Sequence, residues 1–372
     1  MRILVVDVGT GTQDILLFDA ERELENAFKL VMPAPTVVVA ERIRDATRRR
    51  VPLALRGVTM GGGPCHWAAM DHLRAGLAAF ATPDAARTFD DDLDAVRAMG
   101  FQVVSDDEVA RVPGAEQVTL RDFWLDEILA ALRLFGVSTR LDRLAVAVFD
   151  HGAAPPGYSD RVFRFDFLKE RLQRWDDLAA FAFPRDAVPP RLTRLQAVAD
   201  TAPAGLPLLL MDTAPAAVLG ALEDPRVSAQ PSALVVNVGN FHCLAFRLDR
   251  GHVAGLFEHH TGEVSAAQLE SLIARLGRGT LTNEEVFSTK GHGAVIFDAV
   301  ARGEPLPPVA VVGPRRELLR GSQLAPYEAV PHGDMMLAGC FGLLRAYALR
   351  DPQVGEAVER RMGQGPRWER AA

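Results

Sequence analysis

The sequence has few lysines and few cysteines, and acidic residues outnumber basic ones. The only lysines are Lys29, Lys169 and Lys290. With 41 basic against 48 acidic residues the formal net charge is −7, and because general nucleic-acid binders are basic, we expect no nucleic-acid partner. Cys65, Cys243 and Cys340 lie far apart and form no CxxC pair. This spacing argues against a disulfide framework or an iron–sulfur centre and favours a reducing compartment.

Long apolar runs are also lacking. A stretch such as 206–211 (LPLLLM) is far shorter than the roughly 20 residues of a membrane-spanning helix. Asp7 interrupts the first apolar segment, so we expect no signal peptide and a cytoplasmic protein without a membrane partner. The 48% hydrophobic and 24% charged composition is typical of a globular protein, and 372 residues suit two domains or one two-lobed unit.

Apolar segments and glycine turns predict an α/β protein. The segments expected to be strands are 2–8, 14–20, 24–32, 51–64 with its terminal glycines, 141–152, 206–212, three strands within 232–260, and 306–314. The segments expected to be helices are 36–49, 213–222, 265–276, 281–287 and 333–349. A strand, a glycine turn and a second strand occur at 3–18 and again at 233–248. This long-range echo indicates two related halves.

Residues 5–14 (VVDVGTGTQD) place glycines and hydroxyls directly after a strand. A P-loop would need a lysine that is absent here, and a Rossmann fingerprint would need a third glycine where Asp14 stands. A β-hairpin whose turn amides bind phosphate, with Asp7 facing the accompanying metal, fits better. We therefore predict Mg²⁺ at Asp7. The phosphate contacts are expected from Gly9, Thr10, Gly11, Thr12 and Gln13.

The ordered set of motifs resembles the superfamily of acetate and sugar kinases, heat-shock chaperones and actin. DVGTGTQDILLFD (7–19) is similar to its first phosphate motif and LVVNVGNFHCLAF (234–246) to its second. DTAPAAVLGAL (212–222) resembles the helix that precedes the second motif in sugar kinases, and VAVVGP (309–314) stands where the adenosine turn would be. DMMLAGCFGLLRA (334–346) resembles the closing helix, in which Gly339 and Gly342 would allow a close approach of helices.

This resemblance implies a two-lobed, actin-like (ribonuclease H-like) α/β fold with mixed sheets, helices on both faces, and a nucleotide cleft between the lobes. It implies ATP and Mg²⁺ as cofactors, with second-lobe contacts from Asn237, Gly239, Asn240 and Gly313. It also implies that Asp212 activates the hydroxyl that accepts the phosphate. From its position before a helix, Asp212 is equally an N-cap.

Two departures from the superfamily bear on turnover. Asn237 and Asn240 stand where many relatives have an aspartate or Gly-Thr pairs, and an amide cannot accept a proton as a carboxylate does. Pro314 follows Gly313 where kinases tend to have a second glycine. Both departures argue against robust ATP turnover but not against the fold.

Four shorter motifs, TMGGGP, NVGNFH, EHHTG and GHGA, resemble the DUF1786 family within that superfamily. Its members are described as activators of pyruvate formate-lyase. That description implies radical chemistry on a three-cysteine cluster, which the scattered cysteines could not hold.

Glycines and histidines mark a second candidate region. Gly61, Gly62 and Gly63 end a predicted strand and would let the backbone approach a substrate or phosphate closely. Polar residues at other strand ends could meet in the interlobe cleft: Asp150, His151, His242, Glu258, His259, His260 and His292.

Three interpretations of these residues stay open. They could form a second metal site for zinc, iron or manganese, a polar cleft for acid–base chemistry, or separate structural histidines. Because neighbouring strand residues point to opposite faces, His259 and His260 cannot both face one site on a regular strand.

We expect a first lobe at 1–205, a second lobe at 206–349 and a flexible tail at 350–372. The predicted function is ATP binding coupled to phosphorylation of a small molecule or to ATP hydrolysis. One alternative is a nucleotide-dependent activase or sensor that acts on a partner enzyme. The other is a metal-dependent enzyme that uses the histidine-rich cleft on a phosphorylated substrate.

Overall fold

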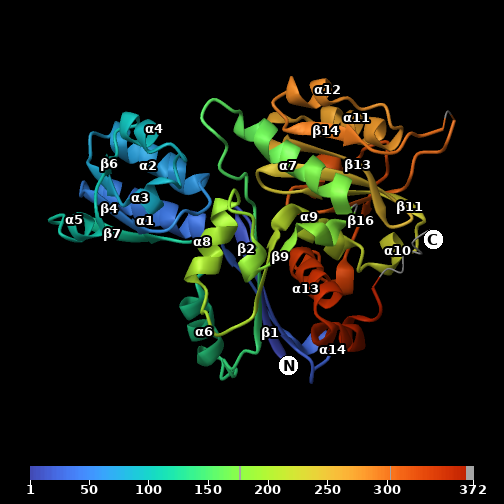
Figure 1. Ribbon diagram of the computed structural model, residues 1–372, viewed down its shortest axis with the longest axis horizontal. Coiled ribbons are helices and arrows are strands. Elements are labelled where there is room, and N and C mark those ends of the chain that lie inside the picture. The colour runs from blue at the N-terminus through green and yellow to red at the C-terminus, as the bar shows by residue number, and fades with distance from the viewer. Residues whose placement is uncertain (176, 302, 366–372) are drawn as a thin grey trace.

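The computed structural model describes residues 1–175, 177–301 and 303–365 (Figure 1). These residues form two six-stranded sheets and one four-stranded sheet. The first two strands of each larger sheet are almost entirely buried, as their continuous apolar sequences predict.

The first sheet has the strand order β3-β2-β1-β8-β10-β9. Strands β1 (Arg2–Val8), β2 (Thr12–Asp19) and β3 (Phe28–Pro33) form an antiparallel meander. Strands β8 (Arg143–Val148) and β10 (Leu208–Asp212) continue it in parallel with β1, and β9 (Ala182–Pro184) closes the edge.

The second sheet, of order β14-β13-β12-β11-β15-β16, repeats this plan. Strands β11 (Ser232–Val238), β12 (His242–Asp249) and β13 (His252–His260) form the meander, and β15 (Val309–Val312) runs parallel to β11. Strands β14 (Gly293–Ile296) and β16 (Tyr327–Glu328) lie at the edges. The two related sheets confirm the two-lobed actin-like fold.

Two helices pack against each other between the sheets (Figure 1). Helix α13 (Ala338–Arg350) covers the first sheet and α9 (Thr213–Ala221) covers the second. Glycines make this contact: a Cβ on Gly220 would overlap the Ala338 carbonyl, and one on Gly342 would overlap the Ala216 carbonyl. The predicted close approach of helices is therefore confirmed at Gly342, whereas Gly339 lies against the Asp7 side chain of β1.

A smaller α/β unit is inserted between β3 and β8, on the left in Figure 1. Its four parallel strands, in the order β6-β5-β4-β7, surround a core of their own with the neighbouring helices. The strands are β4 (Leu53–Gly57), β5 (Ala79–Ala81), β6 (Gln102–Val103) and β7 (Glu116–Leu120). The helices are α1 (Pro35–Arg49), α2 (Pro64–Arg74), α3 (Pro83–Ala86), α4 (Leu93–Ala98) and α5 (Asp106–Ala110).

The remaining helices cover the outer faces and edges of the large sheets. The α-helices are α6 (Leu125–Leu134), α7 (Asp160–Trp175), α8 (Thr193–Thr201), α10 (Pro225–Ser228), α11 (Ala266–Gly277), α12 (Asn283–Phe287) and α14 (Pro352–Met362). Short 3₁₀ turns are η1 (Leu24–Asn26), η2 (Leu178–Phe181), η3 (Arg185–Ala187), η4 (Thr261–Glu263), η5 (Arg316–Leu319) and η6 (Pro331–Gly333). No helix in the described ranges is long and apolar enough to cross a bilayer.

Several expected boundaries are corrected. β10 pairs with β8 and β9, so residues 208–212 belong to the first sheet rather than opening the second lobe. Residues 352–362 form α14, which buries Val354 and Val358, instead of a flexible tail; residues 366–372 lie outside the described part. The strand expected at 24–32 is a 3₁₀ turn followed by β3, the strand within 51–64 is only 53–57, and the last long helix begins at Ala338 rather than at 333.

Candidate functional site

Two glycine hairpins with the same hydrogen bonding face each other between the lobes. In the β1–β2 turn the Gly9 amide donates to the Thr12 carbonyl at 2.9 Å, and in the β11–β12 turn the Gly239 amide donates to the His242 carbonyl at 2.9 Å. The turns touch, because a Cβ on Gly11 would overlap the Asn240 side chain. The repeated strand–turn–strand segments of the sequence thus correspond to two opposed backbone turns.

A cavity, here called the hairpin cavity, lies between these turns and the N-terminal ends of α9 and α13. Most residues predicted to bind phosphate or nucleotide line it, namely Asp7, Gly9, Thr10, Thr12, Asn237, Gly239, Asn240 and Gly313. Two predicted contacts lie outside the lining. Gly11 packs on Asn240, and the Gln13 side chain donates to the Pro33 carbonyl at 3.1 Å.

Two buried carboxylates sit side by side in the hairpin cavity. Asp7 on β1 is the direct cross-strand partner of Asp14 on β2, so both side chains lie on one face of the sheet. Burial raises the pKa of Asp7 to about 7, against a hydrogen bond from Thr213 of 2.5 Å, while nearby Asp212 raises it further. Burial raises the pKa of Asp14 to about 8, with the Asp7 charge as the second cause. The shared cause of both pKa shifts is burial, and neighbouring carboxylates add to it.

No lysine or arginine is among the residues that line the hairpin cavity. Asp14 Oδ1 is buried without a hydrogen-bond partner. Oxygen ligands of this kind suit Mg²⁺, so Asp7 and Asp14 fit the expected cation. Gly339 of α13 lies so close that a Cβ there would overlap Asp7 Oδ2, which shows why this helix begins with small residues.

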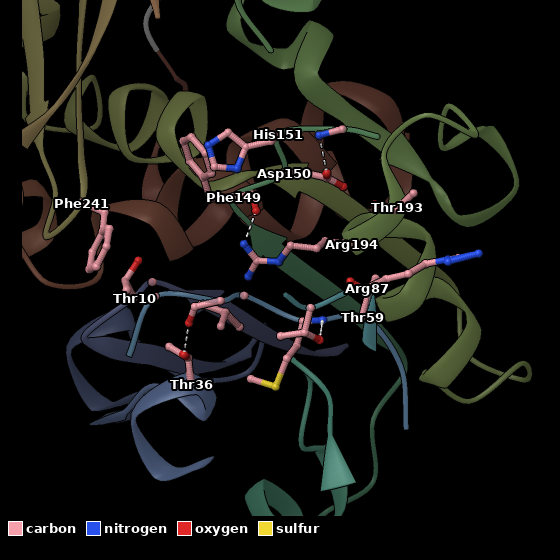
Figure 2. A pocket seen from close by; sticks show the side chains of 18 of the residues that line it. Thr10, Thr36, Thr59, Arg87, Phe149, Asp150, His151, Thr193, Arg194 and Phe241 are labelled. Carbon is pink, nitrogen blue, oxygen red and sulfur yellow. Dashed lines mark hydrogen bonds between the residues drawn. The ribbon is translucent and has the colours of Figure 1, made fainter. Parts of the chain in front are cut away.

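A second cavity, here called the glycine-loop cavity, lies beside the first (Figure 2). Gly61, Gly62 and Gly63 line it together with hydroxyl side chains from Thr10, Thr36, Thr59, Thr88 and Thr193. Asp150, His151 and His242 line it too, as predicted for the interlobe cleft. Residues Gly9, Thr10, Phe149, Phe241 and His242 line both cavities, so the two spaces meet at the first hairpin turn.

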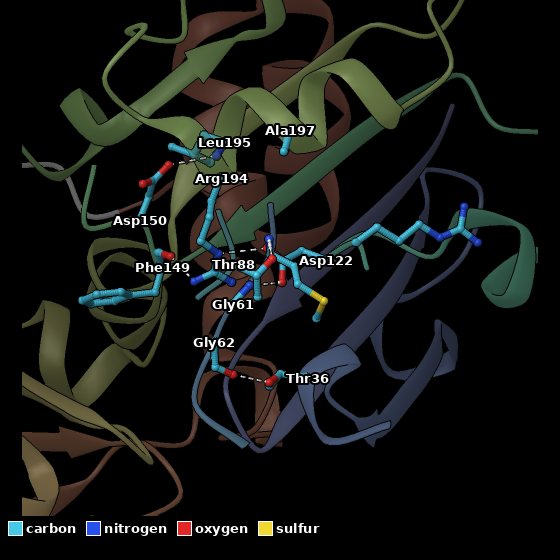
Figure 3. A network of polar contacts seen from close by, with 12 residues as sticks. Thr36, Gly61, Gly62, Thr88, Asp122, Phe149, Asp150, Arg194, Leu195 and Ala197 are labelled. Atoms are coloured by element: carbon cyan, nitrogen blue, oxygen red, sulfur yellow. Dashed lines mark hydrogen bonds and ion pairs between the residues drawn. The ribbon is translucent and has the colours of Figure 1, made fainter. Parts of the chain in front are cut away.

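A polar network holds the glycine loop in place (Figure 3). Thr36 donates to the Gly62 carbonyl, and the Gly61 amide donates to Asp122 Oδ1 at 3.1 Å. Arg194 Nε donates to the other oxygen of Asp122 at 2.9 Å, and the Arg194 guanidinium also binds the Phe149 carbonyl. The loop is therefore fixed to α1, to α8 and to the end of β8.

Three of the predicted histidines converge beside the glycine-loop cavity. Ring nitrogens of His151, His242 and His292 all lie within 4.8 Å of one another. Burial lowers the pKa of His151 to about 3 and lowers the pKa values of His242 and His292, so all three rings are neutral near pH 7. His260 stands next to them, with its ring 4.5 Å from that of His292. His259 instead contacts the Thr289 hydroxyl at 3.2 Å, on the opposite face of β13.

Arg164 of α7 joins the ends of strands from both sheets. Its fully buried guanidinium binds Asp212 at the end of β10 and Glu258 of β13, the latter at 3.2 Å. It also donates to the Asp150 carbonyl at 3.0 Å and stacks on Phe149. Burial raises the pKa of Glu258 to about 7, although Arg164 opposes the shift.

Asp212 and Asp150 are both occupied by other protein groups. Asp212 caps α9 by accepting the Ala214 amide at 3.1 Å and lines neither cavity. The Asp150 carboxylate accepts the Gly152 amide at 2.8 Å and the Leu195 amide at 2.9 Å. The N-cap position that the sequence indicated for Asp212 is present.

The sequence interpretation missed several residues of this region. In the sequence, Asp14 stands out only as a departure from a Rossmann motif, although a second carboxylate in an apolar strand is a usable signal. Nothing local marked Arg164, Asp122 or Arg194, because their oppositely charged partners lie between 48 and 94 positions away.

The family comparison agrees with this geometry. A family model described as "Putative pyruvate format-lyase activating enzyme (DUF1786)" matches residues 60–318, which include the glycine loop, the second hairpin and all three converging histidines. The chain belongs to the DUF1786 family.

The cysteines of this DUF1786 chain do not form a cluster. Cys65 lies on α2, Cys243 on β12 and Cys340 on α13, and all three are buried. Burial raises the thiol pKa of Cys65 to about 11 and that of Cys243 to about 12. These thiols stay protonated near neutral pH and cannot together ligate iron in this arrangement.

Comparison with solved structures shows distant likeness over nearly whole chains. The ethanolamine utilization protein EutJ from Carboxydothermus hydrogenoformans is 14% identical, with 92% of this chain and 89% of that chain covered and a TM-score of 0.34. An inorganic polyphosphate/ATP-glucomannokinase from Arthrobacter sp. strain KM is 11% identical. The match covers 94% of this chain and 99% of that chain, with a TM-score of 0.37. A putative N-acetylmannosamine kinase from Listeria monocytogenes is 11% identical, with 94% of this chain and 99% of that chain covered and a TM-score of 0.34. No curated protein sequence matches significantly.

Proposed function

We propose that this protein binds Mg·ATP in the hairpin cavity and transfers its γ-phosphoryl group to a small polar acceptor, or to water, in the glycine-loop cavity. The observation that carries the proposal is the junction of the two cavities at Gly9 and Thr10. A phosphate chain held by the two hairpins would end at this junction.

The chain's own groups suit each part of this task. The amides of the two opposed turns would donate to phosphate oxygens, as in other backbone anion sites. Thr213 holds the Asp7 carboxylate by a hydrogen bond, so this ligand is oriented before the cation arrives. Bound Mg²⁺ would neutralise the phosphate charge that no basic residue of the cavity lining offsets.

The acceptor side is polar rather than apolar. Threonine hydroxyls and the glycine-loop backbone offer donors and acceptors for a molecule bearing hydroxyl or carboxylate groups. Arg87 also lines this cavity, and its Nη1 atom is buried without a partner. An acceptor with a negative group would satisfy that nitrogen.

We expect Mg·ATP to raise the melting temperature of the purified protein. A ligand at 100 times its dissociation constant adds about 2.7 kcal/mol of stability when it binds only the folded state. Thermal unfolding should be followed with Mg·ATP, Mg·ADP, ATP in EDTA, and Mg²⁺ alone. ATP in EDTA is expected to give little shift, because the cavity binds nucleotide together with the cation. Mg²⁺ alone is expected to stabilise the protein only near pH 8, where Asp7 and Asp14 carry charge. Absence of a shift with any nucleotide at millimolar concentration would contradict the proposal.

A partner-enzyme activase is the second candidate, and the position of Asp212 favours it. This carboxylate is bound to Arg164 and to the first turn of α9, so a role as base would require it to leave both. In an activase, ATP hydrolysis would serve to move the lobes, and no acceptor hydroxyl would need to be activated.

We expect Asp212→Asn to leave basal ATP hydrolysis changed by much less than the roughly 10²- to 10⁴-fold that loss of a general base costs. ADP release should be measured with and without pooled sugars, sugar acids and short carboxylates. The melting temperature of the variant serves as the control for folding. A loss of acceptor-stimulated release within that range, in a folded variant, would instead assign Asp212 the base role of the sugar kinases.

A further inference from the structure

Three neutral imidazoles from distant parts of the chain point their nitrogens at one another. His151 follows β8, His242 opens β12 and His292 precedes β14, and their ligand nitrogens lie within 4.8 Å of one another. His151 extends from the first sheet, whereas the other two belong to the second. The cluster therefore spans the two lobes.

Three ring nitrogens of this cluster lack protein partners. Nε2 of His242 and both ring nitrogens of His292 are buried without a hydrogen-bond partner among the described residues. His292 is only 1% exposed. Buried polar atoms are rarely left unpaired, because an unpaired one destabilises the folded protein. A ligand that accepts nitrogen lone pairs would remove this cost.

The surrounding structure holds the rings in place. His242 stacks on Phe149 with ring centroids 4.0 Å apart and an interplanar angle of 7°. The amide of His292 donates to the Glu258 carbonyl at 2.9 Å. Phe149 is in turn fixed through its carbonyl by Arg194 and through its ring by Arg164. Such support is typical of ligands whose orientation is set in advance.

We infer that His151, His242 and His292 form a binding site for a divalent transition metal of the zinc type, separate from the magnesium site at Asp7 and Asp14. Imidazole nitrogen suits zinc, whereas carboxylate oxygen suits Mg²⁺. Zinc–nitrogen bonds of about 2.05 Å in a tetrahedral arrangement place ligand nitrogens about 3.3 Å apart. The rings would have to rotate to bring the three nitrogens from within 4.8 Å to that spacing.

The metal would keep an open position next to the proposed reaction site. Three histidines leave the fourth tetrahedral position for water or an oxygen of a bound molecule. His151 and His242 line the glycine-loop cavity, and His242 also lines the hairpin cavity. An acceptor hydroxyl or carboxylate could therefore bind the metal directly. Because the ligands come from both sheets, the metal would also hold the lobes together.

Cobalt(II) is a suitable probe because its visible absorption reports four- or five-coordination. We expect the full-length, metal-stripped protein to bind one Co²⁺, and one Zn²⁺ in competition with it, without nucleotide. His292→Ala should weaken this binding by more than about 10²-fold, since even loss of an outer-shell contact costs 10- to 100-fold. Zn²⁺ should also raise the melting temperature of the wild type and not that of the variant.

Three further variants make the outcome decisive. His252→Ala removes a histidine that is bonded to Asp298 at the other end of β13, and it should bind Co²⁺ as the wild type does. Asp7→Asn should lose Mg²⁺-dependent nucleotide binding but keep the Co²⁺ spectrum, so the two sites fail separately. His292→Gln retains a side chain of similar size and should show the same metal loss with normal folding. Equal Co²⁺ binding by the wild type and by both His292 variants, or no Co²⁺ bound by the wild type, would overturn the inference.

Discussion

Arg164→Met is expected to lower the free energy of unfolding by about 3–5 kcal/mol near neutral pH. The substitution keeps most of the side-chain volume but removes the guanidinium that pairs with two buried carboxylates. Asp212 is 3% exposed and Glu258 is 0% exposed, so neither can recover its hydration. Urea unfolding at pH 7.5, compared with the wild type, measures the effect.

The loss of stability in the Arg164 variant is also expected to depend on pH. The pKa of Glu258 is raised to about 7 even with Arg164 present, so the folded state binds a proton that the unfolded state has released. The loss in the variant should therefore shrink as the pH falls from 7.5 toward 5, where the carboxyl is neutral.

A double variant and a surface control complete the test. Glu258→Gln combined with Arg164→Met should recover part of the stability, because one uncompensated charge is removed. Lys169→Met, on an exposed position of the same helix, should change stability by less than about 0.5 kcal/mol. No loss in the Arg164 variant, or an equal loss in the control, would show that the effect does not come from the buried ion pairs.

Asp14→Asn is expected to stabilise the nucleotide-free protein at pH 8 and to weaken Mg·ATP binding by at least about 10²-fold. Two unit charges 4 Å apart interact by about 4 kcal/mol at an effective dielectric constant of 20, which sets the scale of both effects. Without a cation, Asp14 and Asp7 repel each other across β1 and β2. With Mg²⁺ bound, the same charges become ligands.

The raised pKa values of Asp7 and Asp14 predict how the stability of the wild type changes with pH. The pKa values of Asp7 and Asp14 are raised to about 7 and about 8, above the unfolded value of 3.8. Between the unfolded pKa of 3.8 and the folded values, the folded state holds more protons than the unfolded state. The free energy of unfolding therefore falls as the pH rises from about 4 to 8. Mg²⁺ should restore stability at pH 8, and Asp14→Asn should flatten the slope.

Urea unfolding at pH 5, 7 and 8, with and without Mg²⁺, tests the stability part, and nucleotide titration at constant Mg²⁺ tests the binding part. Asp200→Asn replaces an exposed aspartate on α8 and should reproduce the wild type in both. If the Asp14 variant binds Mg·ATP as tightly as the wild type, the carboxylate pair is not the cation site.

Local features predicted much of the hairpin cavity. A glycine turn between two apolar strands is decided by residues within a few positions, which is why both hairpins and their order along the chain could be read directly. The small residues of α9 and α13 likewise indicated the close helix contact, because only glycine allows backbone atoms to meet at Gly220 and Gly342.

Edge and boundary positions were less predictable. The pairing of β10 with the first sheet is a choice of neighbour that its apolar sequence does not encode. Helix α14 buries Val354 and Val358 only because α13 provides a surface for them; polar composition alone indicated a tail.

The sequence by itself determined the repeated strand–turn–strand units and the candidate phosphate turns, since these depend on local backbone preferences. The actin-like fold was implied by the resemblance of the ordered motifs to a known superfamily. The tertiary structure alone decided which charged and imidazole groups meet. Asp7 and Asp14 become neighbours through strand register, and Arg164 reaches Asp212 and Glu258 across 48 and 94 positions. The three histidines of the proposed metal site converge for the same reason: electrostatics and metal coordination depend on distance in space, which strand order and lobe packing fix.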